Sequence, residues 1–338
     1  GEEQALYLLD STAANYIYGR QPMASATAWK IHGCFSLNST QYYQFPIESA
    51  LEGCHDETVA YDHRDPAHPV RNVMKHMYQM REHYPALNDG WLVQKLSWQT
   101  INVTYPGSNG TPTETGMWSI ARGQFDNYQD LGNDTQIVWL VYQNDNKTVN
   151  YKFDCSSKNQ SKTLIAPFDS GTTVKNLFYP YDELTLKDGA VKLGFGGSTE
   201  LNGCLDSLEL KPWDFRAYVP KDKFIGPRPT ITKFTPGHDA RVLSSVAPDA
   251  DETIHVELYF NVEMDCDSVT QSISLTSSTE SGKVPSVDTE SVSCKAITTE
   301  PTRYVGEIAS AWVWAADLTG VYNGIHKLTV KSPTNKDG

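Results

Sequence analysis

The sequence predicts a mainly β protein in which two antiparallel β-sandwiches follow a loop-rich segment that ends in one helix. Three observations lead to this prediction. Short β-branched and aromatic runs with a period of two fill residues 91–219, and similar runs return after residue 230. Clusters of Gly, Asn, Asp and Ser separate these runs, as turns between antiparallel strands require. A chain of 338 residues is also long enough to form two or three domains, each with its own core.

Residues 1–90 are expected to be mostly loop, with one helix at about 66–84. Asp65-Pro66 and then Pro69 offer N-cap and first-turn residues, and Pro85 is expected to stop the helix. Between them apolar side chains recur at spacings of three and four, which gives one stripe for packing against a sheet or barrel. Nothing in this Met-rich stripe requires a cofactor, and none is predicted.

Residues 91–226 are expected to form the first β-sandwich and a linker. The candidate strands are QIVWLVYQ, KTVNYKFD, KTLIAPF, AVKLGF and LELKPWDFRAYV. Trp139 alternates with neighbours in the first of them and is expected in the core. The segment PKDKFIGPRP is punctuated by Pro and Gly, as linkers between domains often are.

Residues 227–338 are expected to form an immunoglobulin-like β-sandwich. Alternate residues of TIHVELYF are expected to face opposite ways, with one apolar set turned to the core: Ile254, Val256, Leu258 and Phe260. SISLT and HKLTVKS are further candidate strands. The Ser/Thr-rich stretch LTSSTESGKVPSVDTESVS is expected to be a mobile surface loop.

Charge and hydropathy narrow the possible partners. The formal net charge is −13 and no cluster of Lys and Arg occurs, which argues against a nucleic-acid partner. No run approaches 18 apolar residues, so this segment requires no membrane contact.

Sequons and cysteines indicate an oxidising, extracellular or luminal compartment. Six N-x-[ST] sequons predict glycosylation during secretion, at Asn38, Asn102, Asn109, Asn133, Asn146 and Asn159. Six cysteines fall in local couples, and pairing neighbours is the most economical of the many connectivities. This pairing joins Cys34 with Cys54, Cys155 with Cys204, and Cys266 with Cys294. Cysteine spacings typical of metal sites are missing from the sequence, so no metal site is predicted.

The remaining polar clusters do not form a recognisable catalytic motif. The stretch GCHDETVAYDHRDPAH holds His and Asp residues that could bind a metal, but their spacing does not bring them to one face of a regular element. MDCDSV lacks the Gly and the distant Glu of a calcium loop, and is expected to be a turn beside a disulfide. The sequence contains no GxSxG motif and no Gly-rich phosphate loop that opens a helix.

Three motifs resemble the α-amylase family of glycoside hydrolases. GEEQ at the start is similar to the turn after the eighth barrel strand, and DPAHPVRNVMKHMYQMREHYPALNDG resembles the last barrel helix. LELKPWDFRAYV is similar to the closing strand of the sandwich that follows the barrel. The resemblance implies that residues 1–90 are the C-terminal remnant of a (β/α)8 barrel, starting after its eighth strand, and that residues 91–226 are an amylase domain C-like sandwich.

Four further stretches resemble fungal cell wall α-1,3-glucan synthases, over essentially the whole chain: LLDSTAANYIYGRQPMASATAWKIHGCF, DHRDPAHPVRN, MDCDSV and GVYNGIHKLTVK. This resemblance implies the extracellular amylase-like region of a multi-pass membrane protein, acting on α-glucan polysaccharide as hydrolase or transglycosylase in wall assembly. The N-terminal part of the barrel and the rest of the parent chain are then the expected partners.

The same resemblance implies that this chain alone is inactive. The three catalytic carboxylates of the family follow barrel strands four, five and seven, which would precede Gly1. The residues expected to contact substrate at the rim of the barrel are Glu2, Glu3, Gln4, Arg20 and Trp29. Burial or structural salt bridging is the alternative fate of each. Two other functions stay open, namely a non-catalytic α-glucan-binding or spacer module and a fragment of an ordinary secreted α-amylase.

Overall fold

The computed structural model describes residues 69–336 except 126–127, 132–136, 180, 196–199, 238–241, 245–246, 248–249 and 300–305. It is mainly β, which confirms the predicted fold class. The expected barrel remnant before residue 69, including GEEQ and the Asp65-Pro66 cap, lies outside the described residues.

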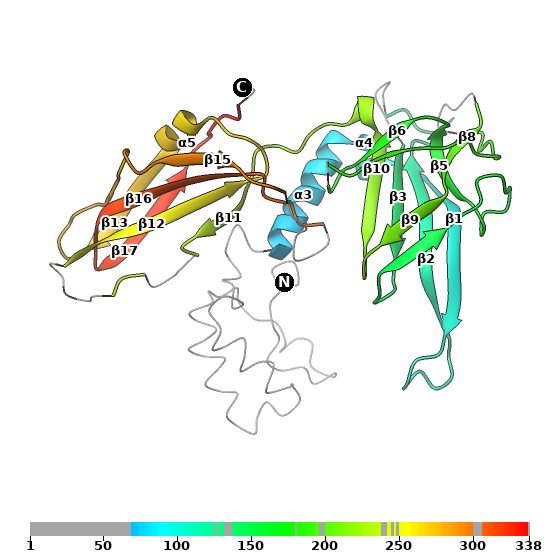
Figure 1. Cartoon of the computed structure of the whole chain (residues 1–338), viewed down its shortest axis with the longest axis horizontal. Coiled ribbons are helices and arrows are strands. Elements are labelled where there is room, and N and C mark those ends of the chain that lie inside the picture. Colours follow the sequence, from blue (N-terminus) through cyan, green and yellow to red (C-terminus); the bar gives the residue numbers. More distant parts are fainter. Residues whose placement is uncertain are drawn as a thin grey trace. The chain divides into compact units, whose positions relative to one another are not determined.

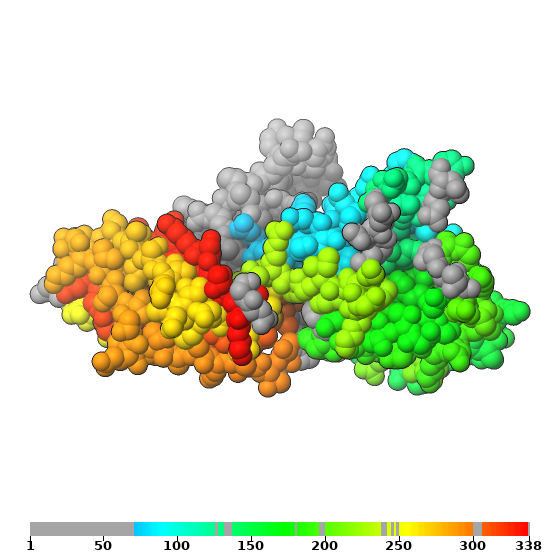
Figure 2. Space-filling model, turned by 90° about the horizontal axis from the view of Figure 1, so that it is seen from above, coloured from blue at the N-terminus to red at the C-terminus, as the bar shows by residue number. Residues whose placement is uncertain are grey.

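The chain divides into two compact units, which are described separately (Figure 1). The first unit comprises Lys75–Arg228 and Thr302–Ile308. The second comprises Pro229–Pro301 and Ala309–Gly338, together with Gly1–Met74. In the space-filling view the described residues of the first unit are mostly cyan to yellow-green, and those after residue 229 in the second unit are mostly yellow to red (Figure 2). Among the described residues, no helix combines the length and the apolar character needed to cross a membrane.

Two helices occupy the region where one was expected. Helix α3 (Pro69–His83) ends before Tyr84, and helix α4 (Pro85–Asp89) begins directly after it. Pro85 therefore stops α3 as predicted, but it also starts α4, because a proline lacks an N–H that the first helical turn does not need. From the predicted stripe, Met77, Met80 and Tyr84 pack into an apolar cluster with side chains of the neighbouring sheet.

The first unit is built around a six-stranded sheet with the order β1-β2-β3-β10-β6-β7. These strands are β1 (Leu92–Val103), β2 (Thr113–Gly123), β3 (Val138–Gln143), β10 (Phe215–Pro220), β6 (Thr173–Asn176) and β7 (Glu183–Thr185). Two small sheets complete the sandwich: β4 (Val149–Lys152) with β9 (Ser207–Leu210), and β5 (Leu164–Asp169) with β8 (Asn202–Leu205). A short 3₁₀ helix, η5 (Lys221–Lys223), follows β10.

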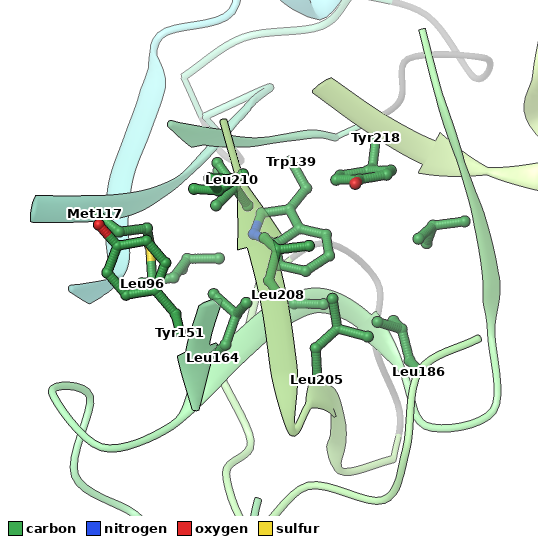
Figure 3. Packing of buried hydrophobic residues seen from close by; sticks show 14 residues of the cluster. Leu96, Met117, Trp139, Tyr151, Leu164, Leu186, Leu205, Leu208, Leu210 and Tyr218 are labelled. Carbon is green, nitrogen blue, oxygen red and sulfur yellow. The ribbon is translucent and has the colours of Figure 1, made fainter. Parts of the chain in front are cut away.

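The core of this sandwich lies between the large sheet and the two small ones. Figure 3 shows the indole of Trp139 at its centre, near Tyr218 and Leu208. Trp139 is fully buried, as its place in an alternating run predicted.

Two predicted strands of this unit were wrong in detail. AVKLGF forms no strand, although Leu193 and Phe195 still pack against the core. Instead, Asn202 fixes the backbone of this stretch through two hydrogen bonds. Its N–H donates to the carbonyl of Val191, and its side-chain oxygen accepts from the N–H of Leu193. LELKPWDFRAYV is two strands, β9 and β10, because the turn around Pro212 passes the chain from a small sheet to the large one.

The second unit is a sandwich of a larger and a smaller sheet. The larger sheet joins β11 (Ile231–Thr235), β12 (Asp251–Phe260), β16 (Trp312–Tyr322) and β14 (Ser286–Val287), with β15 (Ser293–Ala296) also paired to β16. The smaller sheet pairs β13 (Ile273–Thr279) with β17 (Gly324–Val330). In β12, Val256, Leu258 and Phe260 are buried, as the alternation predicted.

The expected mobile loop in the Ser/Thr-rich stretch is a wrong prediction. This stretch contains most of β13, all of β14 and the start of β15. Thr is a good strand former, and the alternate Ser and Thr residues of β13 are the more exposed ones.

The MDCDSV stretch holds the N-cap and the first residues of a helix, so the expected turn was wrong, whereas the disulfide beside it, Cys266–Cys294, is present. Asp265 is the N-cap of helix α5 (Cys266–Ser272), and its side chain accepts a 2.6 Å hydrogen bond from the N–H of Ser268. Within the described residues, no three His, Cys, Asp or Glu side chains lie close enough together to hold a metal ion. The cluster GCHDETVAYDHRDPAH lies outside them.

Candidate functional site

The structure places none of the five expected substrate contacts, because Glu2, Glu3, Gln4, Arg20 and Trp29 lie outside the described residues. The site that the structure does describe is on the large sheet of the first unit. It was not found from the sequence, because it depends on which residues of distant strands are neighbours.

One face of the large sheet packs into the sandwich core, and the other is only partly covered. In β2 and β3 one alternate set, including Met117, Trp139 and Val141, is fully buried in the sandwich core. The other set lies on the opposite face, where Leu140, together with Ala217 of β10, belongs to the apolar cluster that includes Met80 of helix α3. Part of this outer face is therefore covered by helix, and part is not.

Four aromatic residues form a row across the outer face, on neighbouring strands. Trp98 of β1 is the register partner of Trp118 of β2, which is the partner of Tyr142 of β3, which is the partner of Phe215 of β10. All four side chains are half-buried. The rings of Trp118 and Tyr142 stack, with centroids 5.5 Å apart and planes 21° from parallel.

A groove of about 500 Å³ adjoins the Tyr142 and Phe215 end of this row. Its walls come from α3, α4, β2, β3, β10 and the turn before β10. The apolar lining residues that the site depends on are Met77, Met80, Leu87, Tyr142, Trp213 and Phe215. Concave, mostly apolar pockets of this size with a few polar groups are typical of small-ligand sites.

Trp213 stands out within the groove because its side chain is 59% exposed and its backbone is strained. Its φ angle is +58°, in the left-handed region that a bulky residue rarely adopts. The conformation is held by a hydrogen bond from its N–H to the carbonyl of Asp145 and by the bonded turn from Lys211 to Asp214. Strained backbone of this kind is concentrated at functional positions.

Two arginines bring hydrogen-bond donors to the groove. Arg122 Nε donates to the carbonyl of Gly90 at 3.3 Å, and Arg81 Nη2 donates to Asn88 Oδ1 at 2.9 Å. A guanidinium has five N–H groups, so both keep donors for a ligand.

The acidic group in the groove is already engaged. Asp214 is 4% exposed, and its Oδ2 accepts from the N–H of Lys211 and pairs with Arg216 at 3.1 Å. Arg216 also pairs with Asp182, and although burial disfavours its charge, Asp214 and Asp182 help to raise the pKa of Arg216 above its ordinary value. Asp214 therefore serves as a structural partner of this arginine.

A second group of exposed aromatic residues lies near the start of β1. Trp91 is 61% exposed, and Phe125 stacks on Tyr128 with ring centroids 5.0 Å apart. Gln129 connects Trp91 to this stacked pair, because its Oε1 accepts hydrogen bonds from the backbone N–H groups of both Trp91 and Phe125. None of these residues lines the groove.

Two disulfides and four of the six sequons fall within the described residues. Cys155–Cys204 and Cys266–Cys294 are the pairs expected from neighbour pairing, whereas Cys34 and Cys54 lie outside the described residues. The described sequon asparagines are all exposed: Asn102, Asn109, Asn146 and Asn159. Asn38 and Asn133 lie outside the described residues.

Comparison with known proteins places both units in described domain families. Residues 91–224 match the family "Mok13-like, GH beta-sandwich domain", and residues 226–338 match "Mok13, Ig-like beta-sandwich domain". No solved structure gives a significant match. The chain thus joins a sandwich of the kind attached to glycoside hydrolases to an immunoglobulin-like one.

Curated relatives extend this similarity to the whole chain. It is 37% identical over 343 residues to cell wall alpha-1,3-glucan synthase mok13, and 36% identical over 346 residues to cell wall alpha-1,3-glucan synthase ags1, both from Schizosaccharomyces pombe. Each alignment covers 100% of this chain but only 14% of the relative. The two sandwiches of the chain match the Mok13 domain families, and the chain as a whole is homologous to one segment of cell wall α-1,3-glucan synthases.

Proposed function

We propose that the chain is part of the extracellular amylase-like region of a cell wall α-1,3-glucan synthase, and that this region acts on α-glucan chains during fungal wall assembly. The observation that carries the proposal is the alignment of the whole chain with one segment of several synthases. The order of a glycoside-hydrolase-type sandwich and an immunoglobulin-like sandwich supports it.

In this proposal the chain is a non-catalytic part of an enzyme. Residues 1–90 complete a barrel whose catalytic carboxylates are on another part of the parent chain, and Glu2, Glu3, Gln4, Arg20 and Trp29 lie at its rim. The two sandwiches extend to about residues 226 and 338. Hydrolysis with retention needs two carboxyl groups about 5 Å apart across the scissile bond. In the first unit, the neighbouring carboxylates Asp182 and Asp214 are both bound by Arg216, which suits a structural role.

The proposed location is the extracellular face of the plasma membrane, next to the cell wall. Disulfides within both units fit an oxidising compartment. The four exposed sequon asparagines fit passage through the secretory pathway.

A segment exchange in a living fungus tests this function. This chain replaces the homologous segment in the mok13 or ags1 synthase, and alkali-soluble α-1,3-glucan of the wall is measured. We expect the exchange to support glucan formation, whereas an unrelated pair of β-sandwiches of equal length does not. Equal failure of both exchanges would contradict the proposal.

A separate assay tests the non-catalytic role. The purified chain is incubated with soluble α-1,4- and α-1,3-glucans, and reducing ends are measured. We expect no turnover by the chain, against clear turnover by an α-amylase control. Turnover that persists after further purification would show that the chain carries its own catalytic site.

A second candidate function is an α-glucan-binding module that positions the enzyme on its polymer. The row of half-buried aromatic residues beside the groove favours it over a pure spacer. The two functions are compatible, because a binding module can be part of a synthase.

A further inference from the structure

We propose that the groove of the first unit binds a segment of α-glucan, with Trp213 as the stacking residue and Arg122 as a hydrogen-bond donor. This inference rests on the proposed function for the identity of the sugar. The place of the site rests on the geometry alone.

The chemistry of the groove matches a sugar chain. Sugar rings have apolar C–H faces that stack on aromatic rings, and hydroxyl groups at their edges that need hydrogen bonds. The groove offers the aromatic rings of Trp213, Tyr142 and Phe215 in its walls. Arg81 and Arg122 stand among them as donors.

Trp118 of the outer face and Trp213 of the groove differ from two of the core tryptophans in their hydrogen bonds. In the cores, Trp139 Nε1 donates to Ser119 at 2.7 Å, and Trp314 Nε1 donates to Thr270 at 2.9 Å. Within the described part of the chain, the indole N–H groups of Trp118 and Trp213 have no hydrogen-bond acceptor. An indole that keeps a free donor at a surface is suited to bind a polar ligand.

The strained backbone of Trp213 is the second independent observation. A left-handed conformation costs a tryptophan free energy that a glycine in its place would not lose. The strain holds an indole that is 59% exposed at the wall of the groove. Burial in a core does not explain this position, because Trp213 remains 59% exposed.

The polar groups of the groove suit the hydroxyl groups of a neutral polyol. Its carboxylate, Asp214, is buried and paired with Arg216, so the guanidinium groups of Arg81 and Arg122 are the charged groups of the lining that can donate to hydroxyl oxygens. The chain as a whole has a formal net charge of −13, which disfavours an extended polyanion. An α-glucan is the neutral polymer named in the relatives' own descriptions.

A glucan chain that is longer than the groove can extend along the aromatic row from Tyr142 to Trp98. Neighbouring strands lie about 4.8 Å apart, so the four register partners span roughly 14 Å. Lys95 adds a donor at the far end, where its Nζ lies 4.1 Å from the centroid of the Trp98 ring. A chain bound in the groove is therefore expected to contact Trp118 next.

The test measures binding of the full chain to α-1,3-glucan, as retention on the insoluble polymer and by calorimetry with α-1,3-linked oligosaccharides. The main variant is Trp213→Gly, because glycine removes the ring and tolerates the left-handed backbone. We expect a thermal midpoint equal to or above that of the native chain, and an affinity lower by roughly two- to tenfold, as expected for one lost stacking contact. Trp213→Tyr is expected to restore much of the binding.

Two further variants place the site. Arg122→Met is expected to lower affinity, and Tyr128→Ala is the matched control, because Tyr128 is an exposed aromatic residue outside the groove. The proposal is overturned if Trp213→Gly binds like the native chain, or if Tyr128→Ala loses as much affinity as Trp213→Gly. Binding of a polyphosphate in place of the glucan, lost in Arg122→Met, would also overturn it.

The chain's own glycan is an alternative occupant that the same assay resolves. Asn102 lies on β1, two residues after Thr100 and four after Trp98, so all three side chains share one face of the sheet. A glycan on Asn102 would therefore lie on the face that carries the aromatic row. We expect Asn102→Gln to bind α-glucan as the native chain does. Binding that appears only in this variant would show that the row holds the glycan and would contradict the proposal.

The binding assay and the segment exchange test the groove and the proposed function independently. If the segment exchange supports glucan formation while Trp213→Gly binds normally, the groove proposal fails and the function stands. If the groove binds α-glucan but the exchange fails, the proposed function fails and the site stands.

Discussion

The indole of Trp139 donates a 2.7 Å hydrogen bond to the hydroxyl of Ser119, and both residues are fully buried. This bond satisfies the one polar atom of the largest side chain in the first core. It also joins β2 to β3 on their buried face.

Removing the hydroxyl is predicted to destabilise the first unit. In Ser119→Ala the indole N–H keeps its burial but loses its acceptor, so we expect a loss of about 1–3 kcal/mol in the free energy of unfolding. Urea denaturation of the full chain measures it. Thr173→Ala is the control, because that exposed hydroxyl pairs with Thr185 at the surface and its loss is expected to cost below about 0.5 kcal/mol. Equal effects of the two substitutions would contradict the importance of the buried bond.

Local alternation was enough to predict the strands whose two faces differ. In β12 the alternate residues Val256, Leu258 and Phe260 are apolar and buried on one face, so the period of two appears directly in the sequence. It failed at residues 190–195, where Leu193 and Phe195 also alternate. There the side chain of Asn202 supplies a backbone partner that no pattern in AVKLGF could indicate.

The candidate site could not be predicted for a different reason. Trp118, Tyr142 and Phe215 are far apart in sequence and become neighbours only through the register of β2, β3 and β10. Their alternation with core residues shows that they share an outer face, but not that they form one row. The left-handed backbone of Trp213 also depends on the turn, and glycine would have been the residue to expect there.

The two disulfides are predicted to stabilise their units to different extents. Cys155–Cys204 closes a longer loop than Cys266–Cys294, with sequence separations of 49 and 28. Loop closure then implies losses of about 4 and about 3.5 kcal/mol when each pair is replaced by serine. Hydrogen exchange measured by mass spectrometry determines these two losses of stability, because it reports the protection of β5 and β8 separately from that of β13 and β15. Loss of protection in both units from either replacement would argue against separate folding units.

Histidine 76 is predicted to make the first unit less stable in mild acid. Burial lowers the pKa of His76 below its ordinary value of 6.5, and hydrogen bonds with the backbone of Gly306 and Leu177 oppose this shift only in part. The ring is 2% exposed and lies against Phe178, with centroids 5.5 Å apart.

The sign of this pH dependence follows from whether the folded or the unfolded state binds the proton more readily. Below pH 6.5 the unfolded chain takes up a proton that the folded chain still excludes, so the stability contributed by neutral His76 falls as the pH is lowered and is retained well above that value. The slope contributed by one such group is at most about 1.4 kcal/mol per pH unit. Urea midpoints at pH 7.5 and pH 5.5 are compared for the native chain and His76→Gln. A pH dependence that is the same in both would show that His76 does not contribute.

The exposed sequons are predicted to be glycosylated when the chain is made in a secretory host. Asn102, Asn109, Asn146 and Asn159 are all solvent-exposed, as transfer of a glycan requires. At Asn159 the side-chain oxygen already accepts hydrogen bonds from the N–H and the hydroxyl of Ser161, at 3.0 and 2.9 Å. This local turn presents the sequon in an ordered form.

Mass spectrometry before and after enzymatic glycan removal measures occupancy at each site. Removal by the amidase converts each occupied asparagine to aspartate, so peptides containing these residues are expected to gain about one mass unit. Stability is expected to be little changed by Asn146→Gln, because Asn146 is exposed in the turn between β3 and β4 and packs against no core residue. If all four asparagines remain unmodified in such a host, the secretory assignment loses its support from the sequons and rests on the disulfides alone.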